Sequence, residues 1–148
     1  MIKTFNSLFV TMFGVGKIKF APGTFGSLVT TIILFYLFHS LNLSPNVILI
    51  GLILIFIYSF YAVSSHIKDS KNKDPGEIVI DELLGQSIPI YLYEISHNTT
   101  KESGEAIIYY ILFFLLFRYF DIVKPFPVNF FDKNFKNSFG VIMDDLCA

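Results

Sequence analysis

Uncharged, hydrophobic residues fill a long stretch in the first half of the chain. No Asp, Glu, Lys or Arg occurs between Lys19 and Lys68. A membrane-spanning helix needs about 20 predominantly apolar residues, and this stretch holds two candidates, residues 25–41 and 47–63. Residues 42–46, between them, combine Asn, Ser and Pro, which favour a turn. The pattern therefore predicts a helical hairpin that crosses a bilayer twice.

Two weaker apolar runs follow, at residues 83–93 and 106–117, with a polar segment at residues 94–105. Each run is too short to span a bilayer alone. Extended backward to Glu77 and forward to Phe120, they predict a second hairpin that returns to the side from which the first one started. A helix that brings carboxylates into a membrane is costly, so its acids are candidates for a functional site.

The composition agrees with a membrane protein. Only 16% of the 148 residues are charged and 53% are hydrophobic, whereas soluble domains average about 25% charged residues. A single cysteine, Cys147, excludes an intramolecular disulfide, and a net charge of -1 gives no indication of nucleic-acid binding. We predict one all-α domain over residues 1–148, a multi-helical membrane bundle with about four apolar helices and short interfacial helices.

Lysines predict how the first hairpin is oriented. Its connecting turn has none, whereas three precede the hairpin and three follow it: Lys3, Lys17, Lys19, Lys68, Lys71 and Lys73. Cytoplasmic loops of membrane proteins are enriched in Lys and Arg. We therefore expect both ends of the hairpin to lie on the cytoplasmic side.

A polar segment stands just before the first apolar run. It combines Lys17 and Lys19 with a Pro-Gly turn and two hydroxyl residues, Thr24 and Ser27. Lysines near the N-terminus of a helix attract anions such as phosphate. The simpler interpretation is a pair of cytoplasmic lysines followed by a hydroxyl helix cap, and the spacing alone leaves both open.

A second polar segment, residues 74–85, contains four acids. Asp74, with Pro75 after it and Glu77 three residues on, resembles a helix N-cap. On the predicted helix Glu77 and Asp81 share a face, and two like charges in that position repel unless a cation neutralises them. Capping accounts for Asp74 and can account for Glu77. It does not account for Asp81 and Glu82, which lie among aliphatic residues.

Two further charged groups follow. Arg118, Asp121 and Lys124 are spaced three residues apart before a pair of prolines, as in a salt-bridged helix end. Asp144 and Asp145 are adjacent acids among apolar residues. On a helix they project about 100° apart, so they can approach one ion together or divide between the ion and its surroundings.

Topology assigns the candidate residues to the cytoplasmic rim. The acids are Glu77, Asp81, Glu82, Asp121, Asp144 and Asp145, and the cations are Lys17, Lys19, Arg118 and Lys124. Ligands that are all oxygen favour Mg²⁺, which combines carboxylates with substrate phosphate oxygens. The three histidines, His39, His66 and His97, fit no metal or phosphatase spacing. We interpret them as interfacial or loop residues without partners.

Four segments together resemble the phosphatidylglycerophosphatase A family: residues 14–27, 74–86, 117–127 and 139–145. The resemblance implies a helical, multi-pass enzyme of the bacterial inner membrane with its site facing the cytoplasm. It also implies Mg²⁺-dependent removal of the terminal phosphate of phosphatidylglycerophosphate. The family often has Trp where this chain has Phe126, and its members continue from the paired acids into another apolar helix, which we expect this chain to lack.

The resemblance extends to single residues. Asp81, Glu82, Asp121, Asp144 and Asp145 match acidic positions of the family, and Lys17, Thr24, Ser27, Arg118 and Lys124 match polar ones. We assign catalysis to Asp81, Asp121, Arg118 and Lys124, and substrate-phosphate binding to Lys17, Thr24 and Ser27. The expected metal ligands are Glu77, Asp81, Glu82, Asp144 and Asp145.

The expected chemistry is metal-assisted hydrolysis of a phosphomonoester, with Arg118 and a lysine neutralising the phosphate oxygens. An aspartyl-phosphate route stays open, although the chain has no DxD nucleophile motif. Two other classes of function also stay open. An ion-coupled transporter or channel subunit predicts carboxylates near mid-span, and a membrane assembly protein predicts no turnover at all. The sequence indicates no oligomeric state.

Overall fold

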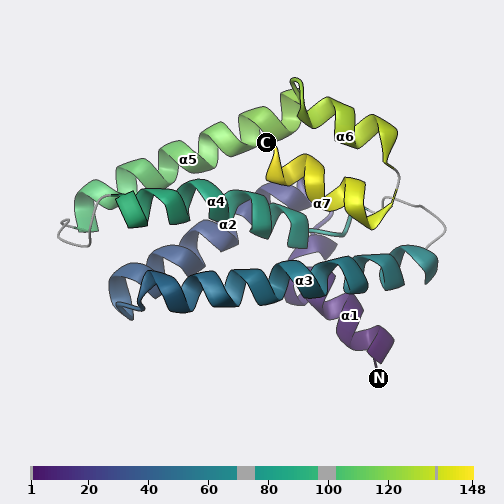
Figure 1. The fold of residues 1–148 in the computed structure, drawn as a ribbon, viewed down its shortest axis with the longest axis horizontal. Helices are drawn as coiled ribbons and strands as arrows, with labels where there is room; N and C mark the ends of the chain where they lie inside the picture. Colours follow the sequence, from purple (N-terminus) through teal and green to yellow (C-terminus); the bar gives the residue numbers. More distant parts are fainter. Residues whose placement is uncertain (1, 70–75, 97–102, 136) are drawn as a thin grey trace.

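The computed structural model describes residues 2–69, 76–96, 103–135 and 137–148 (Figure 1). Every regular element in these ranges is helical, so the predicted all-α fold is confirmed. The elements are α1 (Ile2–Val10), η1 (Met12–Lys17), α2 (Pro22–Phe35), η2 (Tyr36–Ser40), α3 (Pro45–Asp69), α4 (Ile80–Ser96), α5 (Ser103–Val123), α6 (Val128–Asn134) and α7 (Ser138–Leu146).

The two helices and the connecting turn of the first predicted hairpin are confirmed. Helix α2 continues into the π-helical turn η2, and the chain reverses before Pro45 starts α3. In the turn the Leu43 amide donates to the Leu37 carbonyl at 3.0 Å. Proline suits the first position of a helix because its missing N–H has no partner to lose there. In Figure 1 α2 and α3 meet at this turn and then diverge, and both contact α4.

Within the described part of the chain, three helical segments are long and apolar enough to cross a membrane: Pro22–Ser40, Pro45–Lys68 and Gly104–Val123. Large aliphatic side chains such as Ile50, Leu54 and Ile57 point outward from α3, and α5 exposes others in the same way. Extended apolar surfaces of this kind mark membrane or protein contacts. We conclude that the protein associates with a membrane, with α4 as the fourth apolar helix of the bundle.

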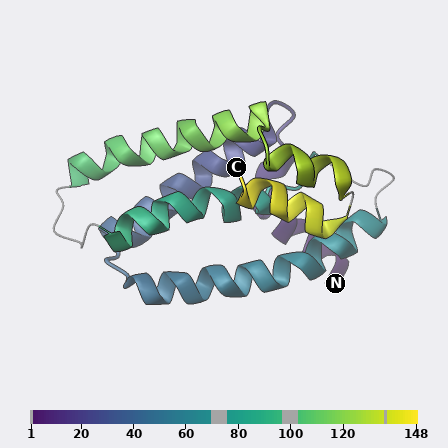
Figure 2. The same ribbon diagram turned by 45° about the horizontal axis from the view of Figure 1, so that its top comes forward.

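Helix α4 occupies the centre of the bundle. It contacts α2, α3, α5 and α7, and Figure 2 shows it between α3 and α5. Val79, just before the helix, and Ile80 and Leu84 from its first turns are buried with Val10 and Ile142 in one apolar cluster. The Val79 amide also donates to the Val10 carbonyl at 2.9 Å, which joins the start of α4 to the end of α1. The residues that open α4 are therefore held from several sides.

The two C-terminal helices fold back over this end of α4. Helix α6 packs on α7, and α7 packs on α4 and α3 (Figure 1). Aromatic contacts link Phe131, Phe135 and Phe139 and join the two short helices. The start of α4, the end of α5 and the last turns of α7 consequently meet in one place, although they are distant in sequence.

Candidate active site

A cavity of about 250 Å³ lies where the starts of α2 and α4 meet the end of α5 and α7. Seven charged side chains of the described residues line it: Asp81, Glu82, Arg118, Asp121, Lys124, Asp144 and Asp145. Sequence reasoning had proposed all seven as site residues. They come from three separate segments, so only the fold brings them to one cavity.

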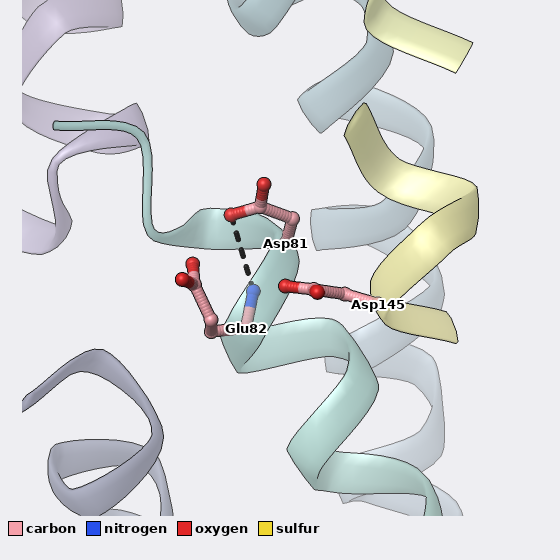
Figure 3. Close-up of side chains that lie close together, drawn as sticks. All are labelled: Asp81, Glu82 and Asp145. Atoms are coloured by element: carbon pink, nitrogen blue, oxygen red, sulfur yellow. Dashed lines mark hydrogen bonds between the residues drawn. The ribbon is translucent and has the colours of Figure 1, made fainter. Parts of the chain in front are cut away.

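Three carboxylates form the centre of the cavity. One oxygen each from Asp81, Glu82 and Asp145 lies within 4.8 Å of the other two. Figure 3 shows the two α4 side chains beside the α7 side chain, with the Glu82 amide donating to Asp81 Oδ1 at 3.1 Å. Asp81 is only 8% exposed and Asp145 only 4%. Glu82 Oε2 is buried without a hydrogen-bond partner among the described residues. We call these three residues the carboxylate cluster.

The carboxylate cluster is electrostatically strained. Burial raises the pKa of Asp81 well above its usual range, and the charges of Glu82 and Asp145 raise it further. Burial likewise raises the pKa of Asp145, with added repulsion from Glu82 and Asp121. The pKa of Glu82 is also raised, mainly by burial. Ionised carboxylates in such a place need a cation beside them.

Both cations of the cavity are already paired with other acids. Arg118 Nη1 lies 2.8 Å from Asp121 Oδ2, as their spacing on α5 predicts, whereas Lys124 Nζ lies 3.0 Å from Asp144 Oδ2 on α7. Arg118 Nη1 also donates to Ser27 Oγ at 3.4 Å. The ion pairs orient both cations, and no ion pair between the carboxylate cluster and a cation occurs among the described residues.

The residues fit a hard divalent cation such as Mg²⁺. Among the described residues, five carboxylates and two cations line the cavity. All candidate ligands are oxygens, as Mg²⁺ requires. A phosphomonoester is itself anionic, so it would be repelled from this cavity unless a further positive charge entered with it. The unpartnered Glu82 Oε2 offers such an ion a buried oxygen.

Two glycines allow these helices to approach one another, and sequence reasoning missed both. A Cβ at Gly23 would overlap Glu82 Oε1, and a Cβ at Gly85 would overlap the Asp145 carbonyl. Gly23 therefore admits Glu82 beside α2, and Gly85 admits α7 beside α4. In the sequence, the only indication of this role is a glycine inside an apolar or helical pattern, because such a glycine often permits close packing.

The backbone is strained at two residues that line the cavity. Ala21 has φ of 44° and Lys124 has φ of 47°, in the left-handed region that non-glycine residues rarely adopt. Ala21 precedes α2, and Lys124 ends α5 next to Asp144. Each such residue costs about 1 to 3 kcal/mol, and strain of this kind clusters at functional sites.

The predicted position of Glu77 on the α4 helix is wrong. The helix begins at Ile80, so Glu77 lies in the turn before it and shares no helical face with Asp81. Its Oε1 lies 3.0 Å from Nε2 of His66 near the end of α3. Glu77 therefore pairs with a histidine outside the carboxylate cluster. Asp74, the predicted cap, lies outside the described residues.

The predicted phosphate-binding residues, Lys17, Thr24 and Ser27, do not line the cavity. Lys17 and Lys19 are exposed, and Thr24 is half-buried in the first turn of α2. Ser27 is fully buried, and its hydroxyl donates to the Gly23 carbonyl at 2.9 Å. Ser27 thus contacts Arg118 without lining the cavity. Phosphate binding by Lys17, Thr24 and Ser27 stays a prediction.

The interpretation of the histidines as unpartnered is wrong for the two that the structure describes. His66 pairs with Glu77, and His39 Nε2 lies 3.1 Å from Glu94 Oε1. Tyr110 also donates to Glu94 Oε1, at 3.0 Å. Both histidines lie in helical segments, and neither lines the cavity. His97 lies outside the described residues.

Comparisons with known proteins identify the family of the chain. The family model described as Phosphatidylglycerophosphatase A matches residues 8–148. A Haemophilus influenzae protein of that name is 37% identical over 136 residues, which are 92% of this chain and 77% of the relative. The Escherichia coli protein of the same name is 30% identical over 138 residues, 92% of this chain and 72% of the relative.

A third relative carries a different substrate in its name. This Bacteroides thetaiotaomicron protein, provisionally named a phosphatidylinositol-3-phosphatase, is 34% identical over 139 residues, 93% of this chain and 82% of the relative. No solved structure matches the chain significantly. The family model covers nearly the whole chain, and the resemblance seen in the four sequence segments is confirmed. The chain belongs to the phosphatidylglycerophosphatase A family of phosphoric monoester hydrolases.

Proposed function

We propose that this protein hydrolyses the terminal phosphomonoester of phosphatidylglycerophosphate, with Mg²⁺, at the cytoplasmic face of a bacterial inner membrane. The observation that carries the proposal is the carboxylate cluster, Asp81, Glu82 and Asp145, buried in a cavity whose other charged groups include Arg118 and Lys124. Family membership supports the reaction class and a lipid substrate. The choice of metal is supported by the all-oxygen donor set.

The carboxylate cluster would hold the metal ion. The chemistry that Mg²⁺ supplies when bound is Lewis-acid polarisation of the phosphoryl group and acidification of a water molecule. Asp81 and Asp145 would contribute buried, ionised oxygens, and Glu82 would contribute the oxygen that has no partner within the described chain. Because the metal relieves their mutual repulsion, all three acids would stay ionised at neutral pH.

Arg118 and Lys124 would bind the phosphate. Their ion pairs with Asp121 and Asp144 hold them in place, and donors held in place before the reaction stabilise developing charge at low reorganisation cost. Arg118 offers a planar fork that suits two phosphate oxygens at once, whereas Lys124 acts as a point charge. Asp121 and Asp144 therefore act as positioning residues for the two cations.

The site's place at one end of the helices supports the enzyme over a transporter. The charged residues come from the start of α4, the end of α5 and the last turns of α7, whereas a transporter of the predicted kind requires carboxylates near mid-span. A phosphate carried on a lipid headgroup lies at the membrane surface, where the ends of spanning helices emerge. The charged site and the phosphate of a lipid substrate would therefore lie at the same level of the membrane.

Phosphate release from purified protein in detergent micelles tests the proposal. We expect release from phosphatidylglycerophosphate that stops on addition of EDTA and returns with excess Mg²⁺. Phosphatidylinositol 3-phosphate serves as the competing substrate, because one relative carries that name. A higher kcat/KM for the inositol lipid would overturn the choice of headgroup. No release from either lipid would favour the assembly protein or the transporter.

A further inference from the structure

A second cavity, of about 420 Å³, opens between α4, α5 and the end of α7. Its walls include Ile88 from α4 and Phe113 and Leu116 from α5. Figures 1 and 2 both place the C-terminus of α7 between these two helices. We call this cavity the α4/α5 groove. Ligand pockets in proteins typically measure about 300 to 1,000 Å³, so the groove is large enough to bind a ligand.

The α4/α5 groove adjoins the candidate active site. Asp145 lines both cavities. At their junction Gly85 allows the Asp145 backbone to lie against α4, and Phe117 closes the same contact, 2.6 Å from where a Cβ at Gly85 would be. A ligand that fills the groove would therefore end beside the carboxylate cluster.

The α4 and α5 walls of the groove suit hydrocarbon. A buried water molecule needs about 2 to 4 polar partners, and the side chains of these two walls offer none. The polar groups of the lining come from α7 and the residues after it, at Asp145, Cys147 and Ala148. Ile88 is 40% exposed and Leu116 is 43% exposed. Leu116 belongs to a segment that is able to span a membrane. The groove thus opens on the side where lipid chains surround the helices.

We propose that the α4/α5 groove binds an acyl chain of the phospholipid substrate while the phosphate of that lipid lies at the carboxylate cluster. The proposal rests on the proposed lipid phosphatase function. A phospholipid joins an anionic headgroup to apolar chains through a short glycerol unit, and here an acid-lined cavity adjoins an apolar groove through one residue, Asp145. Through the groove, the protein would recognise an acyl chain of the lipid in addition to its headgroup.

Filling the groove tests the proposal through substrate choice. Leu116→Trp on α5 and Ile88→Trp on α4 each place a bulky ring in the groove from opposite walls. We expect kcat/KM for a long-chain substrate to fall by at least about tenfold, and kcat/KM for the same headgroup without acyl chains to stay unchanged. The matched control is Leu115→Trp, on the same helix and 58% exposed but outside the groove. Equal losses with both substrates, or no loss with either, would overturn the proposal.

A binding measurement separates the groove from the reaction. The chain has no Trp, so Phe113→Trp introduces a single fluorophore with an aromatic ring in the groove wall. In detergent micelles we expect saturable quenching by a substrate lipid brominated on its acyl chains, and relief by the unbrominated lipid. Leu115→Trp should show only weak, unsaturable quenching. Saturable quenching without turnover would contradict the proposed phosphatase function but not acyl-chain binding in the groove. Equal quenching at both positions would overturn the proposal that the groove binds an acyl chain.

Discussion

Lys124 Nζ lies 3.0 Å from Asp144 Oδ2, which ties the end of α5 to α7 at the rim of the carboxylate-lined cavity. The lysine side chain is 31% exposed and the aspartate side chain 11% exposed. The pair therefore leaves the lysine accessible to a ligand while it stays held by a more buried acid. The left-handed backbone at Lys124 ends α5 at this point.

Lys124→Met should lower kcat by about tenfold or more, because a charge-assisted contact contributes about 1.5 to 3 kcal/mol. Phosphate release by the purified variant measures the loss. Lys133→Met, which removes an exposed lysine from α6, is the control and should keep parental activity. If both variants retain parental kcat, Lys124 has no part in binding the phosphate.

Asp81→Asn should remove a metal ligand while the fold is kept, since the two side chains are nearly equal in shape. We expect activity to fall by about two orders of magnitude, comparable with the loss of one preorganised electrostatic contact. Excess Mg²⁺ should restore only part of it. Glu105→Gln, an exposed acid in the first turn of α5, should leave activity unchanged. Parental turnover and metal dependence in Asp81→Asn would refute the metal assignment.

Metal-free protein should lose stability as the pH rises. Unfolded Asp residues ionise near pH 4, whereas burial holds the pKa of Asp81 and Asp145 above their usual range in the folded protein. The folded state therefore retains protons that the unfolded state has released, and the free energy of unfolding falls with rising pH across that interval.

Mg²⁺ should reverse this trend because it binds only the ionised carboxylates. We expect the increase in Tm on adding Mg²⁺ to be larger at about pH 8 than at about pH 5. Thermal unfolding in detergent with EDTA or Mg²⁺ measures both values. In Asp81→Asn the increase should be small at either pH. An equal increase at both pH values would mean that the metal does not act through these acids.

Gly85→Ala should separate α7 from α4, since the new Cβ would overlap the Asp145 carbonyl. Overpacking of this kind costs about 1 to 3 kcal/mol, and displacement of Asp145 should lower activity as well. Gly51→Ala on α3 is the matched control because its Cβ would meet no atom within 4 Å. There alanine should stabilise the helix by about 0.4 to 1 kcal/mol. Denaturation midpoints and phosphate release together distinguish the two outcomes.

The turn between α2 and α3 should face away from the cytoplasm, and the end of α3 should face toward it. In a Cys147→Ala background, a membrane-impermeant thiol reagent added outside the cell membrane should label Ser44→Cys but not Lys68→Cys. Both positions are exposed in the structure. The reverse labelling pattern would place the carboxylate cluster on the outer face. Lys71 and Lys136, predicted on the cytoplasmic side, lie outside the described residues.

The sequence alone was enough to predict the helical hairpin and the acids of the site. The hairpin follows from local patterns, because apolar runs of spanning length and a turn rich in Asn, Ser and Pro need no distant contact. Asp81 and Glu82 were also predictable as functional, because uncompensated acids among aliphatic residues are costly. The family resemblance added Asp145 to the same site before any contact between α4 and α7 was known.

Long-range packing decided where α4 begins, and the local pattern misplaced that point. The capping pattern predicts a helix from Asp74, but residues 76–79 are non-helical, and Val79 bonds to Val10 and packs in the core. Glu77 consequently pairs with His66 instead of facing Asp81. Neither partner is identifiable from local spacing, since both belong to other segments.

Tertiary structure also decided which of the two C-terminal acids joins the carboxylate cluster. Asp144 and Asp145 are adjacent and indistinguishable by type, yet on a helix they project about 100° apart. Helix α7 lies against α4 at Gly85, so Asp145 meets Asp81 and Glu82 while Asp144 meets Lys124. The sequence determined which charged groups are available to the site. The packing of α7 on α4 determined which acid joins the carboxylate cluster and which one pairs with Lys124, because the direction of a side chain depends on the rotation of its helix.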